Sequence, residues 1–189
     1  MHSVAAVQQG HPEAVVEVWA EDEHRLGLHP VNRMVWVPRG EQPIAALNWR
    51  YEWLWLVGFV QPHSGETDWW IVPLLNTEVF ARLLADFTEH FGLGEHKQVA
   101  LVVDQATYHT TKRLQVPAGM HLLLMPSQSP ELQPAERLWP LTNEVIANQA
   151  FDSLDALEEV TAQRCRALRK QPELIQGLTY YHWWPKVMT

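Results

Sequence analysis

Apolar and polar positions alternate over the first third of the chain, which predicts strands joined by short turns. Val16, Val18 and Ala20 form one apolar face of the first strand, and Asp22 falls in register with that face. A second short strand is expected over 31–37, a central one that is apolar on both faces over 53–60, and a further one over 69–75. This succession is typical of an antiparallel meander.

Helical spacing replaces the alternation in the middle of the chain. Apolar residues recur three and four positions apart after Asn76 or Thr77, either of which can cap the helix, and the pattern ends at Gly92 and Gly94. Two short apolar strands follow, over 99–103 and 121–125. The order of strand, helix, strand, connection and strand is typical of a parallel sheet.

Two further helices are expected in the last third of the chain, one beginning at Pro134 and one running from Ser153 to about Lys170. The predicted fold class is therefore α/β, a mixed sheet flanked by helices, and the order of elements is compatible with a ribonuclease-H-like sheet. Residues 1–12 lack periodicity and are expected to form a flexible leader of little structure, followed by a single domain over 13–189.

Composition restricts the class of protein. A length of 189 residues suits one compact domain, and 47% apolar against 19% charged residues exclude a disordered chain. No apolar run approaches the ~18 residues of a membrane-spanning helix, so no membrane partner is expected. The first residues lack a signal-peptide pattern and Cys165 is the single cysteine, which together favour a cytoplasmic location.

Net charge argues against a broad DNA-binding surface. The formal charge of -8 has the wrong sign for one, so any contact with nucleic acid must be local or mediated by metal ions. Four cations near the end of the last predicted helix are candidate contacts to a DNA backbone: Arg164, Arg166, Arg169 and Lys170. The alternative, which the position at a helix end favours, is a solvated turn stabilised by the helix dipole.

An aromatic segment over 180–185 follows the last predicted helix. Docking on another subunit is one interpretation of such a tail. Packing against its own domain is the other, because aromatic tails are often tied down in that way.

Three acidic residues stand where strands end or helices begin. Asp22 lies on the inner face of the first strand, Asp104 directly follows a buried strand, and Glu136 lies in the first turn of a helix. Phosphoryl transfer by two metal ions needs carboxylates that can share two Mg²⁺ about 4 Å apart. Each residue also has a structural interpretation, because acidic side chains favour helix N-termini, cap turns or lie on solvated edges.

Three segments of the chain resemble the motif blocks of a known family. They read DEHRLGL over 22–28, VVDQATYH over 102–109 and MPSQSPELQPAERLW over 125–139. In order and spacing they are similar to the blocks of the mariner-like insertion-sequence transposases, which are members of the DDE endonuclease superfamily. The third block is the most distinctive, and the resemblance covers roughly residues 15–150.

The resemblance implies a ribonuclease-H-like catalytic domain in which Asp22, Asp104 and Glu136 hold two Mg²⁺ or Mn²⁺ ions. It implies a metal-dependent endonuclease and strand transferase that cleaves DNA at the ends of an element and joins the freed strand to target DNA. The family acts as dimers or larger assemblies, so a homodimer is a candidate assembly. His109 matches a position that often holds His, which implies a ligand-orienting or phosphate-contacting role, with an ordinary polar residue at a helix start as the alternative.

Some positions depart from the family pattern. Gln105 and Gln133 stand where the family usually has Asn, and residues 126–130 read PSQSP in place of PPYSP. Only 21 residues precede Asp22, whereas the family places helix-turn-helix domains upstream, so a separate DNA-binding domain or subunit is expected. These departures leave a second hypothesis, a catalytically silent remnant that acts as a binding or dimerisation module. A general nuclease of the same fold is a third.

Overall fold

Five strands form one mixed sheet in the computed structural model, which describes residues 3–42, 48, 50–127 and 129–186. The strands are β1 (Val15–Gly27), β2 (Trp53–Gln61), β3 (Glu66–Val72), β4 (Lys97–Val103) and β5 (Met120–Leu124). Their order across the sheet is β3-β2-β1-β4-β5. Strand β2 is antiparallel to both of its neighbours, β1 and β3, whereas β4 runs parallel to β1 and β5 runs parallel to β4. The predicted combination of a meander with a parallel half is therefore confirmed.

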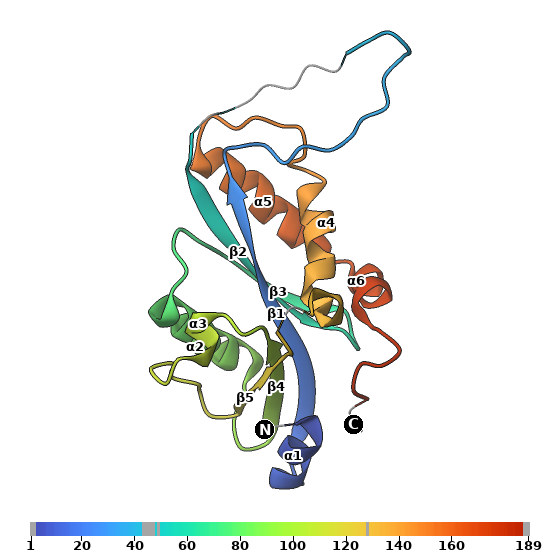
Figure 1. Ribbon diagram of the computed structural model, residues 1–189. Coiled ribbons are helices and arrows are strands. Elements are labelled where there is room, and N and C mark those ends of the chain that lie inside the picture. Colours follow the sequence, from blue (N-terminus) through green and yellow to red (C-terminus); the bar gives the residue numbers. More distant parts are fainter. Residues whose placement is uncertain (1–2, 43–47, 49, 128, 187–189) are drawn as a thin grey trace.

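Helices cover both faces of this sheet (Figure 1). One face carries α2 (Thr77–Phe91) and α3 (Thr107–Thr110), and the other carries α4 (Leu138–Asn143), α5 (Leu154–Leu168) and α6 (Pro172–Thr179). Two short 3₁₀ helices, η1 (Pro130–Leu132) and η2 (Pro134–Arg137), lead into α4. None of the described helices is both long and apolar enough to cross a bilayer.

Strand β1 lies between two hydrophobic cores. Val18 and Ala20 pack into the core beneath α4 and α5, as their predicted alternation requires. On the opposite face Trp19 is fully buried and meets Phe87 of α2 edge-on, with ring centroids 5.0 Å apart. Because helices cover both faces, the side chain of Glu21 is buried as well, with 1% of the residue exposed.

Local signals place helix α2 where the sequence predicts it. Asn76 is the N-cap, and its side chain accepts a hydrogen bond from the Val79 amide at 2.9 Å. Gly92 ends the helix in the left-handed conformation, with φ of 62°. Helix α5 begins in the same way, because the Ser153 side chain caps the Ala156 amide.

The predicted strand over 31–37 is wrong. These residues are irregular, all but the half-buried Val31 are exposed, and the side chains of Met34 and Trp36 lie fully in solvent. In Figure 1 the described part of this connection projects away from the sheet. The physical reason is that the antiparallel partner of β1 over residues 20–27 is β2, and the apolar side chains of segment 32–37 reach neither core.

The ends of the chain also differ from expectation. Residues 1–12 were expected to have little structure, yet Val4–Gly10 form helix α1, capped by Ser3 and anchored by the buried side chain of Val7. Helix α6 has no counterpart in the prediction. The aromatic tail packs on its own domain, because Trp184 is buried in the core with 3% exposure.

Candidate active site

One pocket of about 330 Å³ is lined by all three candidate catalytic carboxylates, those of Asp22, Asp104 and Glu136. The register of the sheet explains how the first two meet. Ala20 of β1 pairs with Val102 of the parallel strand β4, so Asp22 and Asp104, each two residues further along, reach the same level of the sheet. Glu136 comes from η2, beyond β5, and faces the same pocket.

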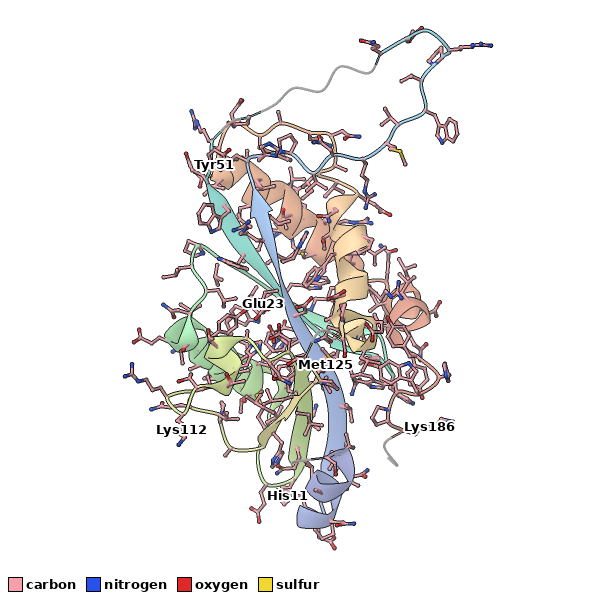
Figure 2. All side chains as sticks on the ribbon, in the orientation of Figure 1. His11, Glu23, Tyr51, Lys112, Met125 and Lys186 are labelled. Carbon is pink, nitrogen blue, oxygen red and sulfur yellow. The ribbon has the colours of Figure 1, made fainter. Side chains whose placement is uncertain are left out.

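Two glutamines hold the loops around this pocket. The Gln105 side-chain amide donates to the Met125 carbonyl at 2.7 Å, which ties the loop after β4 to the end of β5. Figure 2 labels Met125, one of the residues that line the pocket. The buried Gln133 amide donates to the Glu21 carbonyl at 2.8 Å and so anchors η2, which carries Glu136, on β1. The departures from the family pattern thus make specific bonds that shape the pocket.

Asp22 lies in a partly buried environment that disfavours its charge. Burial raises the pKa of Asp22 to about 7, even though the Trp139 indole N–H donates to Oδ2 at 2.8 Å and acts to lower that pKa. Gly58 of β2 pairs with Asp22 of β1. Its lack of a side chain leaves room for Trp139 to reach Asp22, because a Cβ at Gly58 would come within 3.1 Å of the Trp139 ring. Asp22 is therefore close to half-ionised at neutral pH.

Asp104 presents one carboxylate oxygen to the pocket. Its Oδ1 accepts hydrogen bonds from the Ala106 amide at 2.7 Å and from His109 Nδ1 at 2.8 Å. Its Oδ2 accepts no hydrogen bond from the described residues, and half of the side chain is exposed. The first oxygen fixes the orientation of the group, and the second is left to bind a ligand.

His109 joins this site to a second acidic pair that the sequence analysis missed. Its other ring nitrogen, Nε2, lies 3.1 Å from Glu23 Oε1 and 3.5 Å from Glu21 Oε2. Burial acts to lower the pKa of His109, but Glu23 and Asp104 outweigh it and the pKa is raised. The alternation of β1 could have indicated this acidic pair, because Glu21 and Glu23 lie on the same face of the strand as the buried Trp19.

The four candidate DNA-contacting cations lie apart from the pocket. The described residues that line the pocket do not include Arg164, Arg166, Arg169 or Lys170. Arg164 forms an ion pair with Glu144, Arg166 with Glu159, and Arg169 with Asp68, whereas Lys170 is exposed at the end of α5. A role in contacting DNA stays a prediction for these residues.

Replacing Trp139 with Phe is expected to raise the pKa of Asp22 above 7. Phenylalanine keeps an aromatic ring at this position, although it lacks the outer indole atoms that face Gly58, and it removes the N–H that stabilises the Asp22 carboxylate. The ¹³C chemical shift of the Asp22 carboxyl, followed against pH, measures the change. Trp183→Phe is the control, because Trp183 is partly exposed in the C-terminal tail. An unchanged titration in Trp139→Phe would contradict the assigned contact.

Most of the chain matches a known protein family. The model of a family described as "DDE superfamily endonuclease" matches residues 17–158, three quarters of the chain. The chain belongs to the DDE superfamily endonucleases. The matched range of this family member contains Asp22, Asp104 and Glu136, and the resemblance found in the three motif blocks is confirmed.

Individual relatives agree with this membership. The DDE endonuclease chain is 30% identical over 135 residues to "Uncharacterized protein y4pE/y4sA" of Sinorhizobium fredii (strain NBRC 101917 / NGR234), a match that covers 69% of this chain and 96% of the relative. Among solved structures it is similar to a Mos1 mariner paired-end complex with Mn, with 16% identity and a TM-score of 0.58. That match covers 87% of this chain and 56% of the Mos1 chain.

Two more structures extend the likeness in fold. The Mos1 paired-end complex with Mg matches 85% of this chain and 55% of its own, at 18% identity and a TM-score of 0.53. The intasome of simian T-cell lymphotropic virus matches 94% of this chain and 59% of its own, at 10% identity and a TM-score of 0.52. The ribonuclease-H-like fold expected from the sequence is confirmed. The chain spans little more than half the length of these solved chains.

Proposed function

We propose that this DDE superfamily endonuclease is the catalytic domain of a DNA transposase that cleaves DNA and joins the freed 3′-hydroxyl to target DNA. One observation carries the proposal: Asp22, Asp104 and Glu136, which are far apart in the sequence, line the same pocket. The proposed partners are DNA at the element ends and at the target. A second copy of the chain and a separate DNA-binding domain or subunit are the further proposed partners.

The side chains of the pocket suit divalent metal ions. Mg²⁺ and Mn²⁺ prefer carboxylate oxygens, and Asp104 Oδ2 accepts no hydrogen bond from the part of the chain that the structure describes. We propose that Asp22, Asp104 and Glu136 hold two such ions. When bound, these ions would activate the attacking oxygen and stabilise the leaving oxygen of an in-line displacement at phosphorus.

The protein's own contribution is to orient the carboxylates and to shape the pocket. The Ala106 amide and His109 hold one oxygen of Asp104 and direct the other towards the pocket. Gln133 fixes the turn that carries Glu136. Because the chain carries a formal charge of -8, bound cations would be needed to reverse the local field before a DNA phosphate could approach.

Calorimetric titration with Mn²⁺ tests the proposed site directly. We expect heat of binding with the unchanged chain and its loss with Asp104→Asn. Asp155→Asn is the matched control, because Asp155 is an exposed carboxylate in the first turn of α5, outside the pocket. Absence of binding to the unchanged chain would sink the proposed function and leave the silent binding module in its place.

Metal affinity is expected to depend on pH through Asp22. The pKa of Asp22 is raised to about 7 in the folded, metal-free protein, so below pH 7 the carboxyl is protonated and must release its proton to bind a cation. The apparent affinity for Mn²⁺ should fall about tenfold per pH unit below 7 and level off above it. Titrations in buffers of different ionisation enthalpy should show release of about one proton at pH 6 and almost none at pH 8.5. A flat profile would contradict the prediction.

A further inference from the structure

A second cluster of ligand-type side chains lies on the face of β1 opposite to Asp22. Glu21 and Glu23 come from β1 and His109 comes from α3, and one ligand atom from each lies within 4.8 Å of the others. Figure 2 labels Glu23 midway along β1, close to α2 and α3. None of the three lines the pocket that holds Asp22, among the residues that the structure describes.

The cluster is buried, and four of its polar atoms make no hydrogen bond of acceptable geometry among the described residues. Glu21 is 1% exposed and His109 is 4% exposed. Both carboxylate oxygens of Glu21, one of Glu23 and Nε2 of His109 are buried without a hydrogen bond of acceptable geometry to any described residue. An unpaired buried carboxylate is costly, so the arrangement calls for a positive charge among these atoms.

The two distances from His109 are compatible with ligands that share one small cation. His109 Nε2 lies 3.1 Å from Glu23 Oε1 and 3.5 Å from Glu21 Oε2. Four ligands placed tetrahedrally at roughly 2.0–2.1 Å from Zn²⁺ lie roughly 3.3–3.4 Å from one another. Two carboxylates and a neutral imidazole carry a charge of about -2, which one divalent ion neutralises.

The second nitrogen of His109 has the partner that a metal-bound histidine usually has. Nδ1 lies 2.8 Å from Asp104 Oδ1, so an N–H there donates to a carboxylate and leaves Nε2 free to bind a cation. The rings of Phe80 and Tyr108 enclose the histidine, with centroids 4.4 and 4.6 Å from its own. His109 is only 4% exposed beside these aromatic rings, and an electrostatic interaction is stronger where water is excluded.

We propose that Glu21, Glu23 and His109 form a buried structural site for one divalent transition-metal ion of the Zn²⁺ class. The site is distinct from the pocket proposed for DNA cleavage and goes beyond that function. His109 links the two, because the ring that binds the buried ion also holds Asp104 in its orientation. By holding the His109 ring, the buried ion would thereby fix the orientation of the Asp104 side chain in the pocket.

The test uses the full chain with Asp22→Asn and Glu136→Gln, which removes two carboxylates of the pocket and none of the cluster. After equilibration with Zn²⁺ and dialysis, elemental analysis should find one ion per chain. Adding Glu21→Gln should weaken Zn²⁺ binding about 100-fold or more, since a direct ligand is lost. Adding Glu89→Gln, which changes an exposed residue of α2, should leave binding unchanged.

Cobalt provides a second readout that does not depend on activity. Co²⁺ bound to the Asp22→Asn, Glu136→Gln chain should show the intense visible bands of a four-coordinate ion. Should Glu21→Gln fail to fold, judged by circular dichroism, Glu23→Gln takes its place in both measurements. Absence of a retained ion, or equal retention after Glu21→Gln, would overturn the proposal and leave a proton on His109 as the buried charge. Neither outcome depends on whether the unchanged chain cleaves DNA.

Discussion

Asp104→Asn is expected to abolish metal-dependent DNA cleavage while leaving the fold intact. The amide oxygen of the substituted side chain can still accept from the Ala106 amide and from His109, so the local geometry is preserved. The amide nitrogen replaces Oδ2, the oxygen left open to the pocket, and cannot bind a cation. Loss of several kcal/mol of transition-state stabilisation corresponds to a rate decrease of about a thousandfold or more.

Nicking of supercoiled plasmid DNA in the presence of Mn²⁺ measures this effect. The control is again Asp155→Asn, which removes an exposed carboxylate of the same type and should retain the cleavage rate. Thermal unfolding followed by circular dichroism should show both variants close to the unchanged chain. Cleavage retained in Asp104→Asn would rule out the proposed metal ligand, whatever the other carboxylates do.

Gly65→Ala is expected to be the most destabilising small substitution, at about 3 kcal/mol or more. Gly65 lies in the turn between β2 and β3 with φ of 76°, and a Cβ there would come within 1.9 Å of the Pro172 carbonyl oxygen and 2.8 Å of the Gln176 amide nitrogen. Both are backbone atoms of α6, which cannot rotate away. The turn and α6 would have to separate, and the melting temperature should fall by roughly 6–12 °C.

Gly92→Ala separates the packing effect from the backbone effect. Gly92 also has a positive φ, 62°, but a Cβ at this position meets nothing within 4 Å. The substitution should therefore cost only the strain of a left-handed alanine, about 1 kcal/mol. Equal losses of stability in the two variants, measured by urea unfolding, would show that α6 does not pack against this turn.

Much of the fold follows from local patterns. The cap at Asn76, the spacing of apolar residues up to Gly92 and the alternation that includes Asp22 all depend on neighbours within a few residues. Such signals need no knowledge of the rest of the chain. The positions of Asp104 after a strand and of Glu136 at a helix start could be predicted for the same reason.

The sequence-based prediction was wrong where contacts between distant parts of the chain determine the local structure. The segment 31–37 has the composition of a strand, but the antiparallel partner of β1 comes from residues 53–60 instead. The short helix α1 depends on Val7 entering the core with Val16 of β1. An isolated helix of this length is marginal in water, so its own sequence carries too weak a signal.

By itself the sequence determined most of the strands and helices that form the sheet and its covering, and it predicted three carboxylates of the DDE type. Only the tertiary structure decided that β1 is covered on both faces, so that Glu21 and Glu23 are buried beside His109 instead of facing water. The physical reason is that alternation assigns a side chain to a face, whereas burial depends on which helices pack there. Those helices, α2 and α3 on this face, come from residues far along the chain.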